Sequence, residues 1–211
     1  MSLLTRMITF RLVVFTTFIL LISSSSFAEM QSSSNPWVKS YSLESRGYYS
    51  EAAELIRPMI KNGDTKEFAL LRVAWLSYWQ QHYNEAIDGY QQALRLNKNS
   101  FNAKLGISLP LMAQRRWREA SRYLQQVIDE STWNYTANVR LLECLQKLRL
   151  WQKIKPLALG LAKHYPAEAL PFIYLARALL NEGDDKNSLH TYRQVLLRSP
   201  TNQEAIDALK P

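Results

Sequence analysis

The chain has 211 residues and a formal net charge of +8, from 26 basic and 18 acidic side chains. Almost half of the residues are hydrophobic, which is enough for a folded domain with a continuous core. The only cysteine, Cys144, lies on an apolar helical stripe, so an internal disulfide is excluded and we expect a buried, inert thiol.

Residues 1–28 have the three-part layout of a secretory signal peptide. A basic segment without acids precedes an apolar run over residues 12–22, and small residues follow. We expect cleavage between Ala28 and Glu29, followed by a short linker over residues 29–32. The apolar run is shorter than the ~20 residues that span a bilayer, and the alternative is an uncleaved anchor.

This leader predicts an exported protein, in the simplest case in the periplasm of a Gram-negative bacterium. Export from the cytoplasm disfavours a nucleic-acid partner. The net positive charge alone would not exclude one. Apart from an uncleaved anchor, membrane association would be peripheral, through basic side chains that attract anionic lipid headgroups.

The rest of the sequence repeats every 34 residues without insertion or deletion. Equivalent positions carry Ala52, Ala86, Ala120, Ile154 and Ser188, each followed by an apolar stripe. A fixed period of this length is typical of stacked supersecondary units.

The first half of each unit also has a helical pattern. Residues 67–81 and 169–183 place apolar side chains at i, i+3, i+4 and i+7, on one helical face. Each unit is therefore predicted to be a helix, a turn and a second helix. The predicted units are 33–66, 67–100, 101–134, 135–168 and 169–202, with a capping helix over 203–211.

The chain resembles the tetratricopeptide repeat family, whose pattern is W-x2-L-G-x2-Y, then A-x3-F-x2-A, then P. The matching residues are Val73, Ala74, Ala86, Tyr90 and Ala93 in the second unit and Leu175, Ala176, Leu179, Tyr192, Val195 and Pro200 in the fifth. The leading tryptophan is absent from every unit, Leu142 replaces the usual small residue, and Ile154 replaces the usual alanine. The resemblance implies an all-α fold, a right-handed solenoid of about five helix-turn-helix units.

In this family the first helices line a concave groove that binds a partner. Carrying that geometry over predicts groove residues that are mainly aromatic, and Trp75 and Trp79 are four residues apart, on one face. They could bind a partner or fill the packing between units. The predicted groove residues are Trp37, Tyr41, Phe68, Leu71, Trp75, Tyr78, Trp79, Leu105, Leu109 and Met112.

The later units have more polar first helices, so the ligand expected for this groove has one apolar and one polar end. The polar residues expected there are Glu143, Gln146, Lys147, Arg177 and Asn181. The lysine and asparagine clamp with which some relatives hold a C-terminal carboxylate is not supported, because Trp37 and Tyr41 stand where its first members would be.

Basic residues recur in the third and fourth units and are expected to share one edge of the solenoid. They are either ordinary solvated surface or a surface for an acidic partner or lipid headgroups. This basic edge comprises Arg115, Arg116, Arg118, Arg122, Lys147, Arg149, Lys153 and Lys155.

No catalytic pattern is found, and we expect neither an enzyme nor a cofactor. The histidines, His82, His164 and His190, lie in different units without the close pairing that a metal site needs. The predicted function is a scaffold that holds a protein or peptide segment, in cell-envelope assembly or secretion. Two alternatives are a glycan-binding scaffold in polysaccharide export or cell-wall metabolism, and a structural domain that dimerises through its apolar first units.

Overall fold

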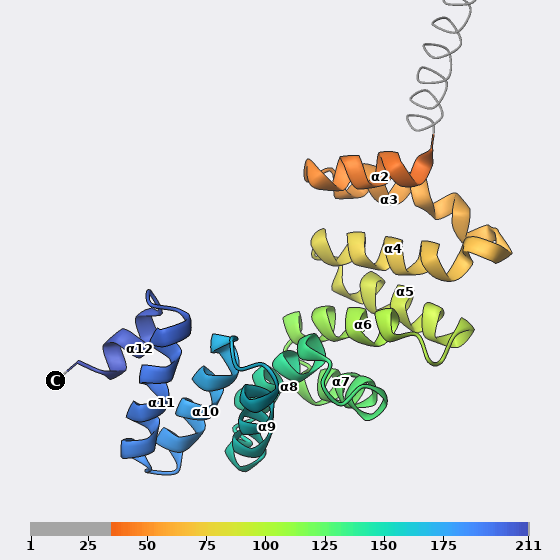
Figure 1. Ribbon diagram of the computed structural model, residues 1–211. Coiled ribbons are helices and arrows are strands. Elements are labelled where there is room, and N and C mark those ends of the chain that lie inside the picture. The colour runs from red at the N-terminus through yellow and green to blue at the C-terminus, as the bar shows by residue number, and fades with distance from the viewer. Residues whose placement is uncertain (1–34, 211) are drawn as a thin grey trace, which may run out of the picture.

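The computed structural model describes residues 35–210, and every regular element in that range is helical (Figure 1). The expected signal peptide, its cleavage site at Ala28 and Glu29, and the linker 29–32 lie outside the described residues. The predicted all-α helical repeat is confirmed.

Five helix pairs follow one another along the chain, and a last short helix follows them. The pairs are α2 (Pro36–Ser45) with α3 (Tyr49–Ile56), α4 (Lys66–Trp79) with α5 (Tyr83–Leu96), α6 (Phe101–Ala113) with α7 (Trp117–Glu130), α8 (Tyr135–Lys147) with α9 (Trp151–His164), and α10 (Ala169–Asn181) with α11 (Asp185–Arg198), before α12 (Gln203–Ala208). Two 3₁₀ helices, η1 (Arg57–Lys61) and η2 (Gly63–Thr65), connect α3 to α4.

Side-chain caps recur at the starts of three of these helices, at positions that are multiples of 34 residues apart. The side chains of Ser100, Asn134 and Asn202 each accept a hydrogen bond from the backbone N–H three residues later, at the start of α6, α8 and α12. Such caps satisfy amide groups that have no partner within the helix.

The turn inside every unit has one residue in the left-handed region. These residues are Gly47, Gln81, Arg115, Arg149 and Gly183, with φ between 57° and 82°. In each turn the backbone N–H of this residue donates a hydrogen bond to the carbonyl three residues earlier. The N–H of the following residue donates to the carbonyl five residues before it. This is the Schellman motif, which ends a helix and reverses the chain.

Small side chains bring the two helices of most units together. Ala52, Ala86, Ala120 and Ser188 are at most 1% exposed, and small residues also occupy the facing positions on the first helices. The Ser188 hydroxyl donates to the carbonyl of Ala176 at 3.0 Å, across the two helices of the fifth unit.

The fourth unit differs because Leu142 and Ile154 occupy these two positions, and both are fully buried. Two larger side chains keep α8 and α9 further apart, and the α8–α9 contact is the smallest of the five pairs. Figure 1 shows the first three units stacked one on another, with the array turning away at α8.

The helix α12 covers the open side of the last unit. Arg177 of α10 donates two hydrogen bonds to Glu204 of α12, and the Tyr192 hydroxyl of α11 donates to the same carboxylate at 2.8 Å. Ala205 is fully buried against the fifth unit. The last apolar surface of the array is thereby shielded, as repeat arrays require.

Cys144 is fully buried in the core, and burial raises the pKa of its thiol to about 11. Within residues 35–210, no helix has the length and apolar character needed to span a bilayer.

Candidate functional site

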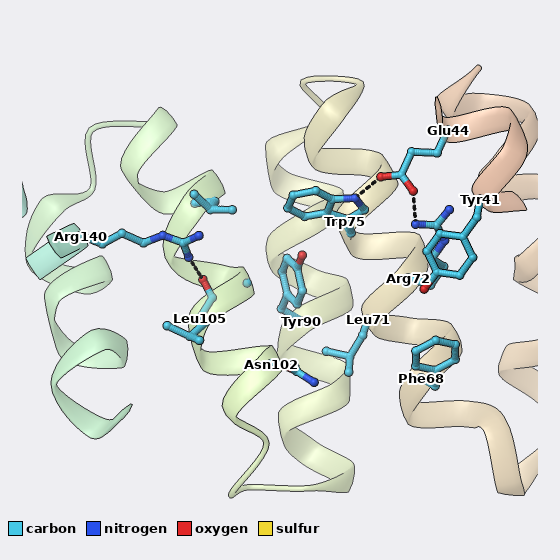
Figure 2. A pocket seen from close by; sticks show the side chains of 12 residues that line it. Tyr41, Glu44, Phe68, Leu71, Arg72, Trp75, Tyr90, Asn102, Leu105 and Arg140 are labelled. Atoms are coloured by element: carbon cyan, nitrogen blue, oxygen red, sulfur yellow. Dashed lines mark hydrogen bonds and ion pairs between the residues drawn. The ribbon is translucent and has the colours of Figure 1, made fainter. Parts of the chain in front are cut away.

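A cavity of about 360 Å³ lies on the face formed by the first helices of successive units (Figure 2). Its walls come from α2, α4, α6 and α8, with Tyr90 contributed by α5, and most of its surface is apolar. The lining residues are Tyr41, Glu44, Phe68, Leu71, Arg72, Trp75, Tyr90, Asn102, Leu105, Gly106, Leu109 and Arg140. We call it the first-helix pocket.

The pocket exists because a glycine stands between two arginines in the repeat register. Arg72, Gly106 and Arg140 occupy the same position in three consecutive units. Gly106 has no side chain, and the ring of Tyr90 packs directly on it, so that a Cβ at residue 106 would lie 2.3 Å from Tyr90 Cε1. The space between the two guanidinium groups therefore stays open.

Arg72 is 5% exposed, and its charge is compensated within the protein. Its guanidinium donates to the carboxylate of Glu44, and its Nε and Nη2 donate to the hydroxyl of Ser40 at 3.2 and 3.1 Å. The Tyr41 ring covers the guanidinium, with 3.8 Å between the ring centroid and the guanidinium carbon. These contacts satisfy Arg72, and they fix the orientation of Tyr41.

Trp75 is tied to the same carboxylate. Its indole Nε1 donates to Glu44 Oε1 at 2.5 Å, and Figure 2 shows Glu44 bridging Trp75 and Arg72. Because the ring is half-buried and held by this hydrogen bond, Trp75 both supports the fold and offers a surface to the pocket.

Arg140 lies on the side of the pocket away from Glu44 (Figure 2). Its Nη1 donates to the carbonyl of Leu105 at 2.7 Å and to the hydroxyl of Ser108 at 3.2 Å. Burial lowers the pKa of its guanidinium, and no carboxylate among residues 35–210 lies within ion-pair distance. Arg140 is thus a half-buried cation whose remaining N–H groups can donate hydrogen bonds to a ligand.

Six of the ten residues predicted for the groove line the pocket. They are Tyr41, Phe68, Leu71, Trp75, Leu105 and Leu109.

The other four predicted groove residues lie elsewhere. Trp37 packs beside Phe68 with 4.8 Å between ring centroids and helps to cover the core. Tyr78 and Trp79 form an aromatic cluster in which Trp79 stacks on Tyr49 of α3. Met112 is buried in the core, away from the pocket, because it lies on the α6 face that packs against neighbouring helices.

The polar half of the pocket was not predicted from the sequence. Apolar and aromatic side chains guided the prediction, which therefore passed over Glu44, Arg72, Tyr90, Asn102, Gly106 and Arg140. The 34-residue spacing of Arg72, Gly106 and Arg140 was a usable signal.

Some of the polar residues predicted for the later units form hydrogen bonds or ion pairs within the protein. Arg177 donates to Gln146 at 2.9 Å as well as to Glu204, so its charge is compensated. Lys147 and Asn181 are exposed, and Glu143 is half-buried.

The predicted basic edge divides into paired and unpaired cations. Arg116 forms two hydrogen bonds to Glu119, and Lys155 pairs with Glu182 at 2.6 Å. Arg115 and Arg149 are exposed at the turns, and Lys147 is exposed at the end of α8. The remaining three, Arg118, Arg122 and Lys153, line a second cavity between α7 and α9.

Residues 68–100 match a family profile described as Tetratricopeptide repeat. Among curated proteins, none matches this sequence. The fold is similar to that of MamA from Desulfovibrio magneticus RS-1, with a TM-score of 0.70, 16% identity, and coverage of 78% of this chain and 93% of that chain.

YrrB, described as a TPR protein with an unusual peptide-binding site, has a TM-score of 0.69 and 15% identity, over 88% of this chain and 96% of that chain. A tetratricopeptide repeat protein from Parabacteroides merdae has a TM-score of 0.74 and 13% identity, over 84% of this chain and 71% of that chain. Because the sequence identities are only 13–16%, the structural similarity shows that the fold is shared and nothing more. Together with the 34-residue register of five helix pairs, these similarities show that the chain has the fold of tetratricopeptide repeat proteins.

Proposed function

We propose that the protein is a non-catalytic scaffold that holds a segment of another protein in the first-helix pocket. The observation that carries this proposal is Arg140, a half-buried cation without a carboxylate partner among the described residues, beside apolar walls from three units. Tetratricopeptide repeat proteins are in general scaffolds, and YrrB, which has the same fold, is described as having a peptide-binding site.

The pocket chemistry indicates what the segment carries. Leu71, Leu105 and Leu109 offer an apolar surface for one aliphatic or aromatic side chain. A half-buried guanidinium gains most from a carboxylate, which it can bind through two parallel N–H groups. We therefore expect a segment that places an apolar side chain next to an Asp, a Glu or a terminal carboxylate.

A glycan fits this pocket less well than a peptide does. Sugar rings stack on open aromatic faces, but one face of Tyr41 is covered by Arg72, and Phe68 packs against Trp37. Glycan binding is therefore the alternative, and a glycan that binds in the pocket would contradict the peptide proposal.

The leader sequence supports a place of action outside the cytoplasm, in the envelope of a Gram-negative bacterium. Expression with a C-terminal tag, fractionation and N-terminal sequencing test this. A periplasmic chain that begins at Glu29 is expected, whereas a full-length chain in the membrane fraction indicates an uncleaved anchor, and a full-length cytoplasmic chain contradicts export.

The binding experiment uses peptides selected on the full chain from a random 12-residue display library. Their affinities are measured for the wild type, for Arg140→Gln, for Tyr41→Ala/Phe68→Ala and for Leu197→Ala. Leu197 is 74% exposed on α11, outside the pocket, so its replacement is the matched control.

We expect the two pocket variants to weaken binding at least tenfold and the control to leave it unchanged. Arg140→Gln should affect acidic peptides most, because it removes their charge partner. Peptides that bind all four proteins equally would contradict the proposal, as would glycans that bind to the pocket and displace the peptides.

A further inference from the structure

A second cavity of about 640 Å³ forms a groove between the second helices α7 and α9. Its floor is formed by Leu141 and Leu145 of α8 and by Leu148, which directly follows that helix. Ile128 of α7 and Leu157 of α9 extend the apolar surface up the walls. We call it the second-helix groove.

The groove follows from the exceptional fourth unit. Leu142 and Ile154 hold α9 away from α8, and α8 is the helix that forms the floor. The helices α7 and α9, of 14 residues each, form the two walls of the groove. A groove of this shape, with a leucine floor, matches an amphipathic helix that lays its apolar face inside.

Cations stand on both walls of the groove. Arg118 and Arg122 come from α7 and Lys153 from α9, and none of the residues lining the groove is acidic. Within residues 35–210, Arg118 and Lys153 have no carboxylate within 4.0 Å, and Arg122 has only a 3.9 Å contact with Glu119. Arg116 and Lys155 nearby are paired with Glu119 and Glu182, so the unpaired charge is concentrated at the groove.

We propose that the second-helix groove binds an amphipathic helix of a partner protein with an apolar stripe flanked on both sides by Asp or Glu. The leucines bury the stripe, and the cations on the two walls meet the acids on its two edges. The leucine floor is recessed between two helices, so a flat bilayer surface reaches the cations without covering the floor. The shape of the groove therefore favours a helix over anionic lipid.

This site is separate from the first-helix pocket. No residue lines both cavities, although α8 contributes to each, with Arg140 in the pocket and Leu141 and Leu145 in the groove. The two sites can be occupied at the same time, so the scaffold would connect two partners.

A display library of 18-residue amphipathic helices tests the proposal on the full chain. Its stripe varies among Leu, Ile, Met and Phe, and its flanks vary among Glu, Lys and Gln. Enriched members are measured against the wild type and Arg118→Glu/Arg122→Glu/Lys153→Glu. The matched control, Lys163→Glu/Lys186→Glu/Arg193→Glu, makes the same charge change at three exposed positions outside the groove.

Enriched helices should carry Glu flanks. Their affinity should fall at least tenfold in the groove variant, change less than threefold in the control, and stay unchanged in Arg140→Gln, which affects the first-helix pocket alone. Leu148→Gln, which leaves every charge in place, should also weaken binding.

The proposal is overturned if no helix is enriched, if Lys flanks are preferred, or if the groove variant binds as well as the wild type while its circular dichroism matches. Binding to phosphatidylglycerol vesicles is measured as well, to test the lipid alternative. If they bind the wild type, lose binding to the groove variant and displace the helices, the groove serves lipid instead.

Discussion

Leu142 of α8 and Ile154 of α9 stand at the two positions where the helices of every other unit approach through small side chains. Both are fully buried, and they separate the helices of the fourth unit. The turn of the array at α8 and the second-helix groove both lie at this unit (Figure 1). A departure from the repeat pattern thus coincides with a change of shape and a candidate surface.

Replacing both large residues should cost less stability than the two single replacements predict. Leu142→Ala and Ile154→Ala each remove a fully buried side chain and should cost about 2–5 kcal/mol. In the double variant the helices can approach as they do in the other units, so part of the cavity closes. Urea unfolding of the wild type, both single variants and the double variant measures the coupling. Strictly additive costs would show that these residues do not hold the helices apart.

Glycine at a left-handed turn position should stabilise the protein. Gln81 and Arg149 have φ of 61° and 57°, and both side chains are exposed. The left-handed conformation costs a non-glycine residue about 1–2 kcal/mol, and glycine avoids this strain. Glycine also has more conformational freedom in the unfolded chain, and this offsets part of the gain in stability. We expect Gln81→Gly and Arg149→Gly each to raise the free energy of unfolding by about 0.5–1 kcal/mol, measured by denaturant titration.

The reverse change is the control for this prediction. Gly183→Ala introduces a side chain where φ is 80°, with no atom within 4 Å of the new Cβ. It should destabilise by about 1 kcal/mol through backbone strain alone. A neutral result at Gly183, or a loss of stability at Gln81, would contradict this explanation.

Alanine at residue 106 should destabilise the protein and distort the first-helix pocket. Its Cβ would lie 2.3 Å from Tyr90 Cε1 and 2.5 Å from Cζ, and Tyr90 is only 3% exposed, so the ring has little room to move. Overpacking of this kind costs about 1–3 kcal/mol. Gly63→Ala is the control, because its Cβ meets nothing within 4 Å and should change stability by less than about 0.5 kcal/mol. Thermal unfolding that places both variants at the same midpoint would rule out the clash.

Acid should release α12 from the last unit. The hydrogen bonds from Arg177 lower the pKa of the Glu204 carboxyl from its usual 4.5, and the Tyr192 hydroxyl adds to the effect. Because the folded carboxyl binds its proton less readily than the unfolded one, the stabilisation is present above about pH 4.5 and is lost as the pH falls through the lower folded value. The protection factors of amide hydrogen exchange over residues 203–209, which correct for the intrinsic slowing of exchange in acid, should therefore decrease as the pH falls below about 4.5.

Two variants isolate this carboxylate. Glu204→Gln should show low protection factors at every pH, because it lacks the charge that Arg177 binds. Asp207→Asn tests the neighbouring acid, whose pKa is lowered by Lys210 and Gln203 on the same exposed surface. If Asp207→Asn abolished the pH dependence and Glu204→Gln kept it, the contact with Arg177 would not be what holds α12.

The helix pairs and their register could be predicted from the sequence. The apolar spacing that forms a helix, the side chains that cap it and the small residues that repeat every 34 positions are local features. Ala86 and Ala120, for example, are fully buried where the period places them. Local patterns of this kind suffice for a repeat fold, because each unit contacts only its neighbours.

Which side chains form a site was decided by the tertiary structure. Arg72 and Arg140 share a repeat position, yet Glu44 compensates only Arg72, and Gly106 opens the pocket between them. Arg116 and Arg118 are equally basic in the sequence, but among the described residues a carboxylate pairs with Arg116 and none pairs with Arg118. The reason is physical: periodicity specifies which residues are buried, whereas pockets and unpaired charges are what remains after side chains from different units have packed, and that depends on their distances in space.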